Sequence, residues 1–285
     1  MIRIAVIGSG TMGNGIAHVF AQHGHPVSLI DISAEALERA TATIAKNLDR
    51  QVKKGTLAAD QVEAVLGRIT TSTDLSAAVN AAIVVEAASE NPEIKYDIFT
   101  RLDRLCPPDT ILASNTSSIS ITDIAAQTGR PDRVIGMHFM NPVPVMELVE
   151  VIRGKGTSDE TTATVMQLSR DLGKTPVEVN DSPGFVSNRV LLPMINEAAW
   201  CVHEGVATPE GVDTVMKLGM AHPMGPLTLA DLIGIDVCLA ILQVLQRGLD
   251  EEKYKPCPLF AEMVARGELG RKSGKGFYDY STGKS

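Results

Sequence analysis

The feature that most constrains the fold is a glycine-rich turn near the start of the chain. Residues 8–13 read Gly-Ser-Gly-Thr-Met-Gly, which fits the pattern G-x-G-x-x-G. A short apolar run from Ile2 to Ile7 precedes this turn, and a helix-length segment from Asn14 to about His23 follows it. A buried strand, a tight turn and a helix in this order are typical of a βαβ unit that holds a dinucleotide at the helix N-terminus.

An acidic residue stands where such a unit needs one. A second apolar run, Val27 to Ile30, ends in Asp31, about 20 residues after the turn. A carboxylate there accepts hydrogen bonds from a ribose hydroxyl and repels a 2′-phosphate, and no arginine occupies positions 32 or 33. The pattern therefore favours NAD over NADP. The alternative interpretation is a glycine-rich turn that binds no ligand.

The alternation of strand and helix continues through the first two thirds of the chain. Further apolar runs and helical segments follow one another, which is typical of a doubly wound α/β domain. The runs are Ile83–Val85, Ile111–Ala113 and Val134–Phe139, and the helical segments are Pro92–Leu105, Ile121–Gln127 and a long one from Ala34 to about Gly55.

The character of the sequence changes after Val179. The residues from Asp181 to Gly184 read as a turn that enters a helix, with Ser182 as the candidate cap. From Phe185 to Val202 apolar residues lie on nearly every face, so we expect a buried helix there, and the chain looks helical to about Leu249. We expect an α/β domain over residues 1–182 and a helical domain over residues 183–285.

Composition and charge exclude several classes of protein. Hydrophobic residues make up 44% of the chain, as in a globular protein, and the net charge of −8 argues against nucleic-acid binding. The uncharged stretch from Ile4 to Ile30 could span a bilayer by length, but glycines and polar residues interrupt it, so we expect no membrane segment. Four widely spaced cysteines indicate no metal site and a reduced, cytoplasmic setting.

Two strand-like runs bring a histidine and a carboxylate together. Val134–Phe139 and Leu148–Ile152 flank a loop that contains Pro144. If the runs fold back about this proline, His138 pairs with Glu150, with Cβ atoms about 5 Å apart. The carboxylate would orient the imidazole and raise its basicity, as a general base requires. The alternative is a structural histidine near a strand end and an unrelated surface glutamate.

Other polar residues lie where a substrate would be expected. The run Ile111–Ala113 leads into Ser114–Ser118, at the edge of the sheet where ligands bind in such folds. These residues could equally form a turn that caps the next helix. The amide of Asn188 lies on the helix that we expect to be buried, and it needs a partner, which could be substrate or backbone.

A basic stripe follows one face of the long helical segment. Four basic residues recur at spacings i, i+4, i+7 and i+8, and with Asp49 counted, residues 46–54 carry a charge of +3. They are Lys46, Arg50, Lys53 and Lys54. The simple alternative is a solvated helix face. Combined with a dinucleotide site, the stripe indicates an anionic, phosphate-bearing substrate.

Six motifs follow one another along the chain: GSGTMGNGIA (8–17), VVEAASENPEIK (84–95), ASNTSS (113–118), HFMNPVPVMELVEV (138–151), DSPGFVSNR (181–189) and RKSGKGFYDY (271–280). Through these motifs the chain resembles the short-chain L-3-hydroxyacyl-CoA dehydrogenases, especially the bacterial members that act on 3-hydroxybutyryl-CoA, over essentially its whole length. The resemblance implies a Rossmann-type doubly wound sheet that binds NAD, followed by an all-helical C-terminal domain for substrate binding and dimerisation.

The resemblance also implies roles for individual residues. His138 would be the catalytic base in NAD-dependent oxidation of an (S)-3-hydroxyacyl-CoA to a 3-ketoacyl-CoA, with Glu150 orienting it. Ser117 and Asn188 would contact the substrate oxygens, and Lys54 the CoA moiety of the acyl-CoA thioester. The residues implied to contact NAD are Gly8, Ser9, Gly10, Thr11, Met12, Gly13, Asp31, Glu90, Lys95, Ser117, Asn141 and Lys272.

Some features depart from the family, and some rivals stay open. Met140 stands where the family often has a second phenylalanine, and Asn47 where some relatives place a serine that contacts CoA. A dehydrogenase of small free hydroxy acids would carry a catalytic lysine where this chain reads GFVSNR (184–189). A sugar-acid dehydrogenase of related fold remains open, as does a non-enzymatic NAD sensor in which the pair of His138 and Glu150 is idle.

Overall fold

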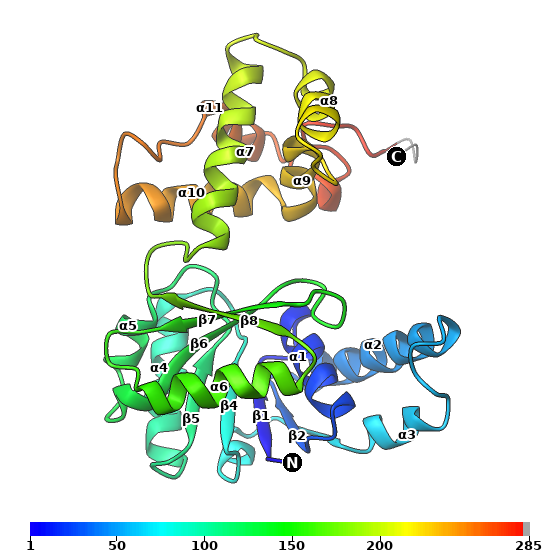
Figure 1. Ribbon diagram of the computed structural model, residues 1–285, viewed down its shortest axis with the longest axis vertical. Coiled ribbons are helices and arrows are strands. Elements are labelled where there is room, and N and C mark those ends of the chain that lie inside the picture. The colour runs from blue at the N-terminus through cyan, green and yellow to red at the C-terminus, as the bar shows by residue number, and fades with distance from the viewer. Residues whose placement is uncertain (282–285) are drawn as a thin grey trace. The chain divides into compact units, whose positions relative to one another are not determined.

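The apolar runs of the first 180 residues form one eight-stranded sheet in the computed structural model (Figure 1). The strand order is β3-β2-β1-β4-β5-β6-β7-β8, and the order reverses between β1 and β4. The first six strands in this order are parallel, β7 runs antiparallel to β6, and β8 is parallel to β7. The predicted doubly wound sheet is therefore confirmed. The strands are β1 (Ile4–Ile7), β2 (Val27–Ile30), β3 (Ile69–Ser72), β4 (Ile83–Glu86), β5 (Ile111–Ser114), β6 (Val134–Phe139), β7 (Leu148–Arg153) and β8 (Thr175–Asn180).

Helices connect all of these strands except β6 and β7, and they cover the sheet. Strands β1, β4, β5 and β6 are buried at every position, which requires cover on both faces of the sheet. Figure 1 shows α6 in front of the strands. The helices of this part are α1 (Thr11–Gln22), α2 (Ala34–Lys53), α3 (Gln61–Leu66), η1 (Leu75–Ala78), α4 (Pro92–Leu105), α5 (Ile121–Ala125), η2 (Pro131–Arg133) and α6 (Asp159–Asp171).

The long helix α2 shows how the sequence fixes one of these elements. Ser33 begins the helix, because its hydroxyl accepts a hydrogen bond from the backbone amide of Ala36 at 3.2 Å. The buried residues of the helix recur on a single face, and they are Leu37, Ala40, Ile44 and Leu48. The opposite face is left to solvent, as the basic stripe predicts.

The chain divides into two compact units, Met1–Ser182 and Pro183–Ser285, and the structure describes residues 1–281. The second unit is helical, with its own core built around Leu192, Ile195, Leu242 and Phe260. Its helices are α7 (Ser187–His203), α8 (Pro209–Gly219), α9 (Pro226–Ile233), α10 (Ile235–Gly248), α11 (Pro258–Ala265) and η3 (Arg271–Ser273).

Two predictions about the start of the second unit are wrong. Ser182 does not cap the first helix, because Gly184 and Phe185 adopt positive φ angles of 74° and 50°, which hold residues 183–186 in a turn. The helix begins at Ser187. It is also not buried all round, since Val190 on this helix is 68% exposed.

Among the described residues, no single helix has the length and apolar character needed to cross a membrane, although the bent pair of α9 and α10 together meets that test by length and composition. The four cysteines, Cys106, Cys201, Cys238 and Cys257, are all free thiols.

Candidate functional site

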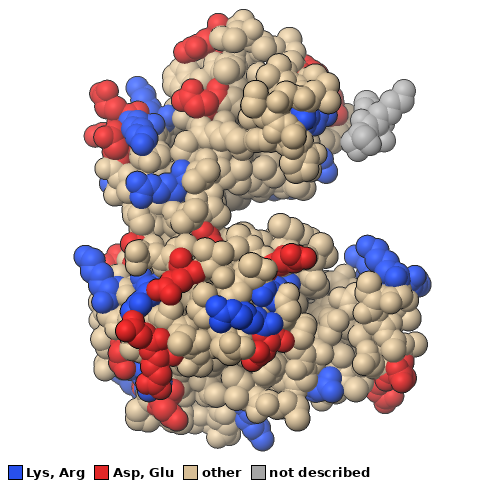
Figure 2. Space-filling model, viewed as in Figure 1, with Lys and Arg blue, Asp and Glu red and all other residues tan. Residues whose placement is uncertain are grey.

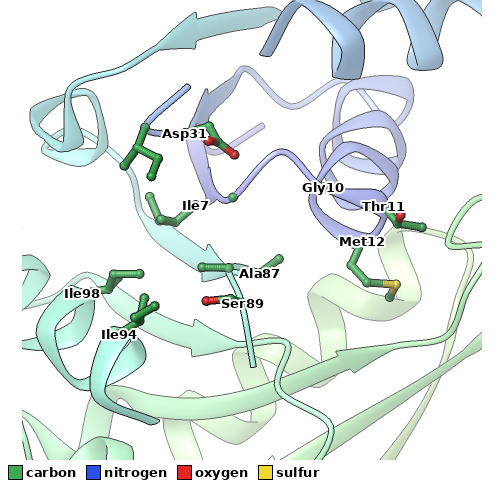
Figure 3. Close-up of a pocket in the computed structure, with 12 residues that line it drawn as sticks. Ile7, Gly10, Thr11, Met12, Asp31, Ala87, Ser89, Ile94 and Ile98 are labelled. Carbon is green, nitrogen blue, oxygen red and sulfur yellow. The ribbon is translucent and has the colours of Figure 1, made fainter. Parts of the chain in front are cut away.

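A cavity opens where the strand order of the sheet reverses, at the carboxyl ends of β1, β2 and β4. Its volume is about 520 Å³. Figure 3 shows how the glycine-rich turn, the end of β2 and the start of α4 surround it. The lining residues are Ile7, Gly8, Gly10, Thr11, Met12, Asp31, Ile32, Ala87, Ala88, Ser89, Ile94 and Ile98. A reversal point of this kind is where doubly wound sheets bind their ligands.

The three glycines of the turn have different reasons to be glycine. Gly8 has a φ of +93°, and a Cβ there would lie 2.6 Å from the carbonyl oxygen of Ala87. A Cβ on Gly13 would lie 1.8 Å from the carbonyl oxygen of Gly8. A Cβ on Gly10, in contrast, would meet nothing within 4 Å. The protein itself therefore requires the first and third glycines, whereas the second leaves open space in which a ligand can approach the backbone.

The start of α1 offers this space to an anion. Gly10 is the N-cap residue, so no side chain caps the first turn, and that turn contains no acidic residue. The free amides and the positive end of the helix dipole favour a phosphate group. These properties fit the pyrophosphate of a dinucleotide.

Asp31 lies directly after β2, at the edge of the same cavity. Its Oδ2 accepts hydrogen bonds from the backbone amide and the hydroxyl of Ser9, both at 2.7 Å, and its Oδ1 accepts one from the amide of Ser33 at 3.1 Å. Burial opposes ionisation, but these hydrogen bonds outweigh it and lower the pKa of Asp31 below its ordinary value. The group is thus a carboxylate at neutral pH, as recognition of a ribose without 2′-phosphate requires.

Glu90 organises the loop that follows β5. Its Oε1 accepts hydrogen bonds from the hydroxyl of Thr116 at 2.5 Å and from the backbone amides of Ser117 and Ser118 at 2.9 and 3.1 Å. Burial opposes ionisation, yet the charge of Lys95 and these hydrogen bonds lower the pKa of Glu90. Glu90 therefore fixes the position of Ser117, one of the predicted substrate contacts.

Lys95 lies deeper than a direct ligand contact would suggest. Its side chain is 1% exposed, and its Nζ lies 2.7 Å from Glu86 Oε1 and 3.4 Å from Glu90 Oε2. Glu86 is a functional candidate that sequence reasoning missed. The sequence did contain a signal for it, because Glu86 is an acidic residue at the end of the apolar strand β4, just as Asp31 directly follows the apolar strand β2.

The predicted pairing of His138 with Glu150 is confirmed. Strands β6 and β7 are antiparallel with these two residues opposite each other, and His138 Nδ1 lies 2.8 Å from Glu150 Oε2. Both residues are buried. Asn115 connects β5 to the same place, because its Oδ1 accepts a hydrogen bond from the amide of Phe139 at 2.9 Å. The imidazole is thus held in a fixed orientation at the carboxyl end of β6. Asn141 lies exposed in the loop that follows, before Pro142.

The basic stripe of α2 is exposed along its length. Lys46, Arg50 and Lys53 lie on the helix, and Lys54 is its C-cap residue. Figure 2 shows Lys and Arg side chains gathered at the far end of α2. This surface can bind an anion.

Two predicted site residues belong to the second unit. Asn188 lies in the first turn of α7 and is partly exposed, so the expectation that it sits on a fully buried helix is wrong. Lys272 lies in η3, and its Nζ contacts both carboxylate oxygens of Asp236 at 2.5 and 2.7 Å.

Comparison with known proteins agrees with this geometry. Residues 3–182 match the family model of the NAD binding domain of 3-hydroxyacyl-CoA dehydrogenase, and residues 184–280 match that of its C-terminal domain. A probable 3-hydroxybutyryl-CoA dehydrogenase of Bacillus subtilis is 59% identical over 278 residues, which cover 98% of this chain and 97% of the relative. A 3-hydroxybutyryl-CoA dehydrogenase of Clostridioides difficile is 50% identical over 280 residues, 98% of this chain and 100% of the relative. The crystal structure of (S)-3-hydroxybutyryl-CoA dehydrogenase from Ralstonia eutropha superposes with a TM-score of 0.96 at 51% identity, covering 99% of this chain and 100% of that one.

Proposed function

Because the chain belongs to the 3-hydroxyacyl-CoA dehydrogenase family, we propose that it oxidises (S)-3-hydroxybutyryl-CoA to acetoacetyl-CoA with NAD and catalyses the reverse reduction. The observation that carries the proposal is the buried pair of His138 and Glu150 at the same sheet edge as the dinucleotide cavity. A non-enzymatic NAD sensor would have no use for an oriented imidazole at that place.

His138 is the proposed general base. Glu150 accepts a hydrogen bond from the Nδ1–H group, which directs the lone pair to Nε2, the nitrogen that would take the proton of the 3-hydroxyl group. In the reduction, the same nitrogen returns the proton to the forming alkoxide, and Glu150 stabilises the imidazolium. NAD bound at the glycine-rich turn would supply the chemistry of accepting the hydride from C3.

Other residues would bind and position the substrate. Ser117, held by Glu90 through its backbone amide, is the proposed contact for the substrate oxygen. Lys54, at the exposed end of the basic stripe, is the proposed contact for the phosphates of CoA. For Asn188, Asn141 and Lys272, the family resemblance supports the proposed roles, toward substrate for the first and toward the dinucleotide for the others.

We further propose a cytoplasmic homodimer. All four cysteines are free, which agrees with a reducing compartment. The second unit exposes large apolar side chains that a second copy of the chain could cover, and they include Val206, Val215, Leu218, Met220 and Leu232.

The test of the activity is the oxidation of NADH by the purified chain with acetoacetyl-CoA, with free acetoacetate as the comparison substrate. We expect kcat/KM for the thioester to exceed that for the free acid by at least about 100-fold, because the acid lacks the CoA contacts. Failure to turn over the thioester while NADH still binds would contradict the proposal, and equal use of the free acid would favour a free hydroxy acid as substrate.

Substitution of Lys54 tests the site proposed for CoA. We expect Lys54→Glu to raise KM for acetoacetyl-CoA about three- to tenfold, with kcat little changed, because the lysine would bind a remote part of the substrate. Lys155→Glu, at another exposed lysine of the same unit, is the matched control. An unchanged KM in Lys54→Glu, or the same rise in both variants, would remove Lys54 from the site.

A further inference from the structure

We propose that Glu86 is a specificity-determining residue of the cofactor site, whose buried negative charge strengthens binding of the oxidised nicotinamide relative to the reduced form. This inference rests on the proposed dehydrogenase function and names a residue to which neither the sequence motifs nor the family comparison gave a role.

Glu86 occupies a central position in the sheet. It is the last residue of β4, opposite Ile7 of β1 and Ser114 of β5, and its side chain is fully buried. It therefore lies at the reversal of strand order, directly below the edge at which the dinucleotide cavity opens.

The contacts of Glu86 show that it is a carboxylate. Its Oε1 accepts hydrogen bonds from Lys95 Nζ and the backbone amide of Ala88, both at 2.7 Å. Its Oε2 accepts them from Lys95 Nζ at 3.0 Å and the hydroxyl of Ser114 at 2.7 Å. Four donated hydrogen bonds fill the acceptor positions of an ionised carboxylate and leave no place for a proton.

The surrounding charges do not cancel. Lys95 Nζ also lies 3.4 Å from Glu90 Oε2. The trio of buried Glu86, buried Lys95 and partly exposed Glu90 thus holds two carboxylates and one ammonium group, a net charge of −1. Without Glu86, the ammonium and Glu90 would neutralise each other.

The trio lies beside β4 and β5, on the side of the sheet's strand-order reversal that the nicotinamide half of the cofactor must occupy. Asp31, at the end of β2, would bind the ribose of the adenosine half, and the turn after β1 would bind the pyrophosphate. A dinucleotide crosses the reversal, so its other half extends over the ends of β4 and β5. Those strand ends carry Glu86 and Ser114. Glu90 is connected to the same place, because it accepts a hydrogen bond from the amide of Ser117 in the loop that follows β5.

The two forms of the cofactor differ in charge at that end. The oxidised nicotinamide ring carries a positive charge, which the reduced ring lacks. A fixed negative charge in a site shielded from water attracts the oxidised ring and has little effect on the neutral one. Glu86 therefore stabilises bound NAD⁺ relative to bound NADH.

The test is the dissociation constant of NAD⁺ and of NADH, each measured alone by calorimetry on the full chain, in the wild type and in Glu86→Gln. We expect the constant for NAD⁺ to rise about five- to tenfold and that for NADH to stay within about twofold, because the change removes one partly shielded charge. Glu86→Asp, which keeps the charge, should keep the ratio of the two dissociation constants close to that of the wild type.

Two matched variants separate charge from structure. Ser114→Ala removes a hydrogen bond to the same carboxylate without altering charge, and Glu63→Gln removes a charge from an exposed position on α3. We expect both to keep the ratio of the two constants within about twofold of the wild type.

Should Glu86→Gln fail to fold, Glu90→Gln makes the same change in net charge and should weaken NAD⁺ binding selectively as well. Equal weakening of NAD⁺ and NADH, or no change in either, would overturn the inference. These are binding measurements made without substrate, so their outcome is independent of whether acetoacetyl-CoA is turned over.

Discussion

His18 shows at the scale of one residue how burial makes stability depend on pH. Its side chain lies fully buried on α1, where Nε2 is 3.0 Å from Gln22 Oε1 and Nδ1 has no partner among the described residues. Burial lowers the pKa of His18 from 6.5 to about 4, and its hydrogen bond to Gln22 only partly opposes this effect. The folded protein therefore holds this imidazole neutral where the unfolded chain would be protonated.

We predict that His18 weakens the fold as the pH falls from about 7.5 to about 5. In this range the unfolded chain binds a proton at His18 and the folded chain does not, so the free energy of unfolding should drop by roughly 2 kcal/mol from this group. In His18→Gln that contribution is absent, and urea unfolding at the two pH values should show a smaller loss. The same loss in both proteins would contradict the prediction.

At the scale of the element, the turn between β1 and α1 allows a matched pair of substitutions. Gly10→Ala places its methyl group in open space, so the fold should be retained while the methyl group obstructs the pyrophosphate. Gly13→Ala brings its methyl group to 1.8 Å from the carbonyl oxygen of Gly8, so the backbone must move. One change should affect binding and the other stability.

We expect Gly10→Ala to raise the dissociation constant of NADH at least about tenfold and to change the free energy of unfolding by less than about 1 kcal/mol. Gly13→Ala should lower that free energy by about 1–3 kcal/mol or more. Fluorescence titration with NADH and urea unfolding measure the two effects. Unaltered NADH binding in Gly10→Ala would show that the open space serves another purpose.

The same elements show what the sequence could and could not predict. Short apolar runs identified the buried strands, and the symmetry about Pro144 correctly paired His138 with Glu150. Both signals are local. The ion pairs of Lys95 with Glu86 and Glu90 depend on how β4 and α4 pack together, so spacing alone did not reveal them. The positive φ of Phe185, which delays the start of α7, is unusual for a bulky residue and had no signal in the sequence.

At the scale of the whole molecule, the division of the chain assigns different tasks to its parts. The first unit contains the dinucleotide cavity and the pair of His138 and Glu150. The second unit has its own apolar core and also leaves apolar side chains in solvent, with Val215 and Leu218 of α8 60% and 83% exposed. Exposed apolar residues at spacing i, i+3 on one helix are suited to a contact with a second chain.

We predict a particle of twice the chain mass of 30.4 kDa in solution. A charge on α8 should disrupt it, so Leu218→Glu should shift the particle toward the monomer in light scattering coupled to size-exclusion chromatography. Val145→Glu, at a residue of the first unit that is 71% exposed, is the control and should remain dimeric. A monomeric wild type would refute the dimer, and a dimeric Leu218→Glu would exclude α8 from its interface.

We propose that His138 transfers the proton and that Glu150 acts through His138. The most direct measurement is kcat for NADH-dependent reduction of acetoacetyl-CoA in His138→Gln, Glu150→Gln and the double variant, with NADH affinity measured in each. We expect losses of about 1000-fold or more for His138→Gln and about 10- to 100-fold for Glu150→Gln, with the double variant no worse than His138→Gln alone. NADH affinity should stay within about threefold of the wild type, because neither residue lines the dinucleotide cavity. A kcat in His138→Gln above about a tenth of the wild-type value, or losses that multiply in the double variant, would contradict this mechanism.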